Sequence, residues 1–142
     1  TGHANIARAV LEAVRSSAPR GLIGVGRGIN IGAAINSDQA INMTGTKWRI
    51  DKVVLANASA DITASGCLAS LRDASGGGGN ALVAAFDFTN LTAAGKLNTQ
   101  TLAAIAATDV VTANPLYFRI GAATHASQAT VDVMIYGECL YP

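Results

Sequence analysis

The chain has few charges and few aromatic side chains. Of its 142 residues, 13% are charged and 5% are aromatic, although 50% are hydrophobic. Much of the apolar content is therefore alanine, which buries little area per residue. A monomer with so few charges would have difficulty staying soluble, so we expect other subunits to cover much of its surface. The alternative is a stable monomer rich in Ala, Ser and Thr.

Other absences exclude whole classes of function. The net charge is +1 and no run of basic residues is present, so we expect no nucleic-acid partner. No apolar run approaches the roughly 20 residues of a membrane span, and we expect neither a membrane partner nor a signal peptide. The two cysteines, Cys67 and Cys139, are expected to be free buried thiols, with a disulfide as the alternative.

Side chains with catalytic or ligand spacing do not stand out. His3 and His125 have no second His, Cys or acid at metal-ligand spacing, so we expect no metal and no cofactor. The glycines in residues 24–28 do not follow the dinucleotide-binding pattern. Glycosidases use a pair of carboxylates, and no feature of the sequence singles out two of its candidate acids for that role. These acids are Asp51, Asp61, Asp73, Asp87, Asp109, Asp132 and Glu138. We therefore predict that the protein is not an enzyme, with a hydrolase as an alternative.

What the sequence does contain is a series of short segments in which apolar and polar residues alternate. The last, residues 130–141, places five residues on its apolar side: Val131, Val133, Ile135, Cys139 and Tyr141. Other strands are predicted at 29–36, 47–57, 61–71, 81–88, 97–102, 109–112 and 116–120. About eight strands at this spacing predict a single all-β domain, an antiparallel β-sandwich.

The N-terminal region follows a different pattern. Residues 5–17 predict an amphipathic helix with an apolar stripe made of Ile6, Val10, Leu11 and Val14. A helix of about thirteen residues is marginal alone in water, so its stripe must be buried. We predict that this stripe contacts a neighbouring subunit. A helix folded over its own sheet is the alternative.

Glycines mark two further predicted features. Those at 21, 24, 26 and 28 predict a flexible hinge, which divides the chain into an arm at 1–28 and a sandwich at 29–142. The four consecutive glycines at 76–79 predict a mobile, exposed loop tip without a binding role.

The order of several segments resembles a group of small structural proteins of tailed bacteriophages. Residues 37–41 precede a Lys-Trp-Arg-Ile strand at 47–50, and Val-Val-Leu-Ala-Asn-Ala-Ser follows at 53–59. Similar pieces come later, at the glycine loop and at 81–85, 91–96, 116–120 and 131–137. The resemblance covers roughly residues 29–142. It implies a virion component of the capsid decoration, or cement, type, with a jelly-roll-like sandwich.

The resemblance also implies partners and a location. We expect a homotrimer on the surface of the phage head that binds the major capsid protein and staples neighbouring capsid subunits. The protein would be made in the cytoplasm of the host bacterium. A tail, neck or fibre component is one alternative. A carbohydrate-binding module is another, because four aromatics could line a sugar site: Trp48, Tyr117, Tyr136 and Tyr141.

Overall fold

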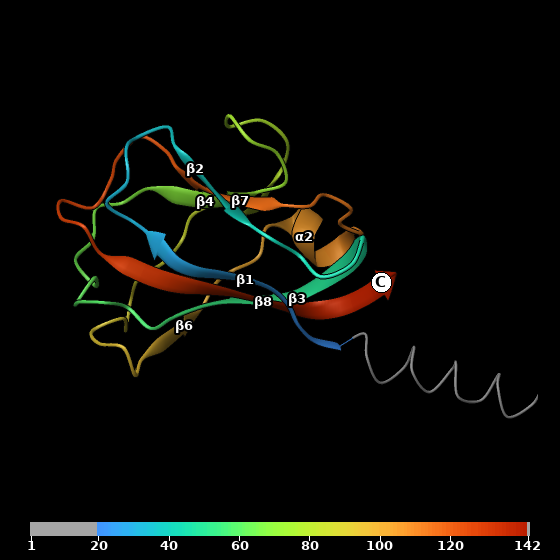
Figure 1. Ribbon diagram of the computed structural model, residues 1–142, viewed down its shortest axis with the longest axis horizontal. Coiled ribbons are helices and arrows are strands. Elements are labelled where there is room, and N and C mark those ends of the chain that lie inside the picture. The colour runs from blue at the N-terminus through green and yellow to red at the C-terminus, as the bar shows by residue number, and fades with distance from the viewer. Residues whose placement is uncertain (1–19, 142) are drawn as a thin grey trace, which may run out of the picture.

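Two antiparallel sheets packed face to face make up the structure, a computed structural model that describes residues 20–141 (Figure 1). One sheet has the strand order β1-β8-β3-β6 and the other β2-β7-β4-β5. The strands are β1 (Arg20–Asn30), β2 (Asp38–Ile41), β3 (Lys47–Ala56), β4 (Ala69–Arg72), β5 (Ala81–Val83), β6 (Leu97–Thr99), β7 (Leu116–Ile120) and β8 (Thr130–Tyr141). This confirms the predicted all-β sandwich.

The strand order follows from a nested set of pairs. β1 pairs with β8, β2 with β7, β3 with β6 and β4 with β5, all antiparallel. This is one long ribbon of paired strands rolled so that alternate pairs enter alternate sheets. Pairing of β8 with β3 and of β7 with β4 then closes each sheet. Such a roll of eight strands is a jelly roll, as the resemblance implied.

The core lies between the sheets and is built by the predicted alternation. Val131, Val133 and Ile135 of β8 are fully buried, whereas Tyr141 is 60% exposed, so its predicted inward position is wrong. Tyr141 is the last residue of β8, where it pairs with Lys47 at the start of β3. The largest fully buried side chains come from both sheets and their connections, and they include Trp48, Leu55, Leu71, Leu82, Leu116 and Phe118.

Several strands are shorter than the alternation predicts. The run at 61–71 yields only β4, and the run at 81–88 yields only β5. In both runs an aspartate accepts hydrogen bonds from the threonine two residues later, Asp61 from Thr63 and Asp87 from Thr89. Such local side-chain bonds form turns in place of a strand ladder. The predicted strand at 109–112 is reduced to a bridge between Trp48 and Val111. It follows α2 (Ala104–Thr108), which was not predicted.

The predicted hinge at residues 21–28 is wrong, because this segment is most of strand β1. Two irregularities in its pairing with β8 accommodate the glycines. A side chain at Gly24 would overlap the Met43 sulfur, and one at Gly26 would lie 2.8 Å from Ile41 Cγ1. The glycines therefore let β1 pass close to β2 and the residues that follow it. The predicted boundary at residue 28 falls inside a strand.

Candidate interaction surface

Apolar side chains occupy the outer side of the β1-β8-β3-β6 sheet. Inward residues such as Val133 and Leu55 belong to the core, so their neighbours along the strands point outward. The pairing aligns Val25, Met134 and Val54 in one row across the three strands. We define the outer apolar face as Leu22, Val25, Val54, Ala56, Leu97, Met134 and Tyr136.

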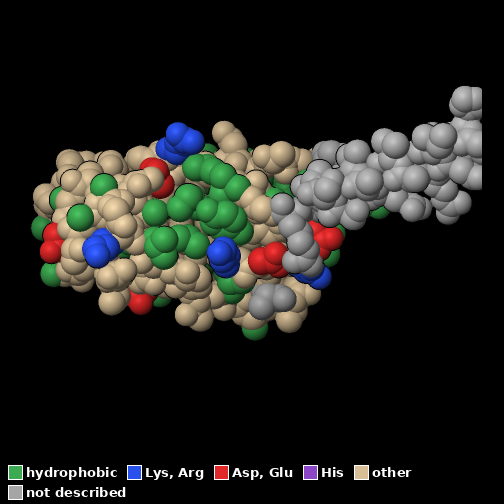
Figure 2. Space-filling view, turned by 90° about the horizontal axis from the view of Figure 1, so that it is seen from below, with side chains coloured by type: hydrophobic (Ala, Val, Ile, Leu, Met, Phe, Trp, Pro, Cys, Tyr) green, Lys and Arg blue, Asp and Glu red, His purple; other side chains and the backbone are tan. Residues whose placement is uncertain are grey.

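This face is a continuous patch. Figure 2, which views the molecule from the side of this sheet, shows hydrophobic side chains gathered at its centre with charges around them. Leu22 on β1 is 50% exposed and Leu97 on β6 is 57% exposed, so the two edges of the patch are open. Val54 and Ala56 are buried although they lie outside the core cluster. Gathered apolar surface of this kind marks interaction sites.

Charged residues on the rim of the face are mostly engaged with each other or with the sheet. Arg49 forms an ion pair with Glu138 at 2.8 Å, and the Lys52 ammonium lies 4.9 Å from the centre of the Tyr136 ring. The Asp132 carboxylate accepts hydrogen bonds from the Gly28 N–H at 2.8 Å and from the Asn57 side chain at 2.9 Å. A polar rim around an apolar centre is the usual anatomy of a protein interface.

The outer side of the other sheet is polar. Asp38 and Arg119, which are paired across β2 and β7, form an ion pair at 3.0 Å with both side chains largely buried. The glycine loop closes over it, since the Gly76 N–H donates to Asp38 at 2.9 Å. The four glycines are exposed, as predicted, but the loop is tied to the sheet. Because the outer side of this sheet is polar, the outer apolar face of the other sheet is the stronger candidate for an interaction surface.

Cys67, Ser65 and His125 come closest to a nucleophilic arrangement. His125 Nδ1 lies 2.9 Å from Ser65 Oγ, and the same oxygen accepts the Cys67 N–H at 3.2 Å. Burial raises the pKa of the Cys67 thiol, which favours the unreactive protonated form. These contacts hold a turn ahead of β4. Both cysteines are free, as predicted, although Cys139 is only partly buried.

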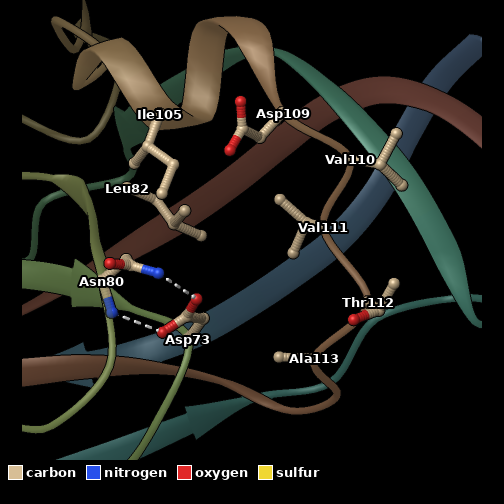
Figure 3. A pocket seen from close by; sticks show the side chains of 9 residues that line it. All are labelled: Asp73, Asn80, Leu82, Ile105, Asp109, Val110, Val111, Thr112 and Ala113. Atoms are coloured by element: carbon tan, nitrogen blue, oxygen red, sulfur yellow. Dashed lines mark hydrogen bonds between the residues drawn. The ribbon is translucent and has the colours of Figure 1, made fainter.

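One small pocket, shown in Figure 3, brings two of the candidate acids together. Asp73 and Asp109 lie on opposite sides of a pocket of about 140 Å³ that is also lined by Leu82, Ile105 and Val111. The Asp73 carboxylate accepts the Asn80 N–H at 2.7 Å, closing the glycine loop, and Asp109 accepts the Thr108 hydroxyl at 2.9 Å. Ligand sites usually span roughly 300 Å³ or more. We interpret this pair as structural.

The four aromatics of the sugar-binding alternative do not converge. Trp48 is fully buried and donates its indole N–H to the Thr44 carbonyl. Tyr117 lies on the outer side of one sheet and Tyr136 on the outer side of the other. Tyr141 lies at the end of β8 with Lys47 over its ring. No shared platform for a sugar ring results from these four positions.

Residues 20–141 lack two further features. They contain no cluster of three or more His, Cys, Asp or Glu side chains placed to hold a metal ion. Within the same range, no helix has the length and hydrophobicity needed to cross a membrane.

The predicted contact residues Ile6, Val10, Leu11 and Val14 lie outside the described residues. The outer apolar face was not predicted, because Met134 and Tyr136 lie on the side opposite the predicted apolar side of residues 130–141. The signal that could have revealed it is that these two positions, and Val54 on β3, carry apolar or aromatic residues where strict alternation would place polar ones.

No protein-family model, curated protein or solved structure matches the chain. The resemblance to phage structural proteins therefore rests on the sequence motifs alone.

Proposed function

We propose that this protein is a non-enzymatic virion component, a capsid decoration protein that binds and stabilises the assembled phage head. The observation that carries the proposal is the outer apolar face. In an isolated chain, Leu22 and Leu97 leave much of their apolar surface in water. Covering such a surface with another protein releases that water and stabilises the complex.

The proposed mechanism is burial of neutral surface across subunit boundaries. A homotrimer would present three copies of its capsid-binding surface at once, and linked contacts raise avidity without strong single contacts. A ligand that binds the assembled shell and not free subunits stabilises the shell by mass action. The low charge content suits a surface that becomes covered.

Two further features support this role. Jelly rolls are frequent in viral capsid proteins, although lectins and enzymes use them too, so the fold alone does not fix function. The motifs at 37–41, 47–50 and 53–59 resemble phage structural proteins in their order. The partner implied is the major capsid protein, and the location is the head surface.

Immunogold electron microscopy of particles released by cells that carry the gene tests the proposal. We expect gold on the heads, and we expect heads that lack the protein to rupture at a lower temperature. Gold on tails, necks or fibres would instead support the virion alternative. Particles without label would contradict the proposal.

A glycan array tests the carbohydrate-binding alternative against the decoration-protein proposal. We expect no binding, because the four candidate aromatics lie apart. Millimolar or tighter binding that is lost in Tyr136→Ala would favour the sugar-binding module.

A further inference from the structure

The outer apolar face borders the place where the described chain begins. Arg20 opens β1 opposite Glu138, and Leu22, two residues later, already belongs to the face. β1 is the edge strand of this sheet. Arg20, the first described residue, therefore lies at the border of the patch.

The sequence of the segment before Arg20 matches the patch in character and size. Ile6, Val10, Leu11 and Val14 recur at the spacing of one helical face. A helix over residues 5–17 would be roughly 20 Å long. Four strands spaced by roughly 4.8 Å form a sheet of similar width. An apolar helix stripe against an apolar sheet face is a stable two-layer arrangement.

The residues next to Arg20 favour a second copy over the same chain. Pro19 disfavours helical backbone at Ala18, so Ala18 favours an extended conformation and the helix predicted before it does not continue into β1. A segment packed on its own sheet would have to reverse direction at these two residues. A segment that continues past the sheet edge reaches a neighbour instead.

We propose that residues 5–17 of one copy dock on the outer apolar face of a second copy. The contact buries Leu22 and Leu97 of the receiving copy under the stripe of Ile6, Val10, Leu11 and Val14. This inference rests on the self-association part of the proposed function and assigns the two surfaces that meet.

Single charges placed on each surface test the contact in the full chain. Leu11→Asp changes the stripe, and Ser16→Asp is its matched control on the opposite side of the predicted helix. Leu22→Asp changes the face at a half-exposed position that should still fold, with Leu97→Asp as a second variant. Ala40→Asp is the matched control, exposed on the outer side of the other sheet.

Sedimentation equilibrium should show that the unmodified chain self-associates at micromolar concentration. We expect Leu11→Asp, Leu22→Asp and Leu97→Asp each to weaken association about a hundredfold, because a charge enters an apolar contact. Both control variants should associate like the unmodified chain. An equimolar mixture of Leu11→Asp and Leu22→Asp should recover a heterodimer, since the intact stripe of Leu22→Asp can dock on the intact face of Leu11→Asp.

Three results would overturn the inference. The first is a full chain that stays monomeric at 100-fold higher concentration. The second is association that survives Leu11→Asp but not Leu22→Asp, which would indicate two faces packed directly together. The third is a mixture that does not recover. Because these measurements use the isolated protein, they can fail while immunogold labelling of heads succeeds, and the reverse also holds.

Discussion

Individual side chains hold the long connections of this fold in place. Asp61 and Asp87 each accept two hydrogen bonds from a threonine two residues later, and the residue between them, Ile62 or Phe88, is buried. The aspartate and threonine thus form a turn that directs the middle side chain into the core. The same three-residue pattern, Asp-x-Thr, is used twice.

These turns predict a specific loss of stability in acid. The threonine hydrogen bonds hold the pKa of both carboxyls below the ordinary value of 3.8. Their stabilising effect is therefore complete above about pH 4 and is lost as the pH falls through the lower folded-state pKa. We expect the melting temperature of the Asp61→Asn, Asp87→Asn double variant to fall less between pH 5 and pH 2.5 than that of the unmodified protein. Parallel curves of melting temperature against pH would contradict this.

The two thiols should differ in reactivity. Cys67 is buried and its pKa is raised by desolvation, whereas Cys139 is partly exposed near the end of β8. We expect maleimide at pH 7 to label Cys139 in the folded protein at least tenfold faster than Cys67, because the thiolate is the reactive form. Both should react alike in denaturant. Faster labelling of Cys67 in the folded state would show that its segment opens.

At the scale of elements, close contact between backbones explains why some glycines are required. Gly137 of β8 pairs with Ile50 of β3, next to the pair formed by Glu138 and Arg49. A side chain at Gly137 would overlap the Arg49 carbonyl oxygen and lie 3.0 Å from Ile23 Cδ1. A side chain at Gly95 would meet nothing within 4 Å.

This contrast gives a matched pair of variants. We expect Gly137→Ala to lower the free energy of unfolding by about 2–4 kcal/mol, because β8 must move away from β3. Gly95→Ala should change it by less than about 0.5 kcal/mol. Urea unfolding of both variants measures the difference. Equal stabilities would mean that the β3–β8 contact can widen without cost.

Clear alternation predicted some strands correctly, but the alternating run predicted as a strand at 29–36 is wrong beyond Asn30, where the chain forms turns. β3, β7 and β8 follow from β-branched and aromatic residues at every second position. β1 was missed because glycine disfavours strands locally, and its partners Ile41 and Met43 are close only in the folded chain. The outer apolar face was missed for a similar reason. Val25, Val54 and Met134 are far apart in sequence and form one row only through the strand pairing.

For the whole molecule, the account depends on the difference between its two outer sides. One carries the Asp38–Arg119 ion pair beneath the glycine loop, and the other carries the outer apolar face. A protein with one apolar side and few charges gains stability by covering that side. Whether the outer apolar face is covered in the assembled protein is therefore the quantity to measure.

Oxidation of the two methionines tests this account most directly. Met134 lies in the outer apolar face, whereas Met43 is buried in the core and serves as the internal control. Exposed methionine oxidises readily to the sulfoxide. In the assembled protein treated with hydrogen peroxide, mass spectrometry of peptides should show Met134 oxidising as slowly as Met43. Oxidation of Met134 in the assembly at the rate of a free methionine peptide would show that the face stays open, and would contradict the account.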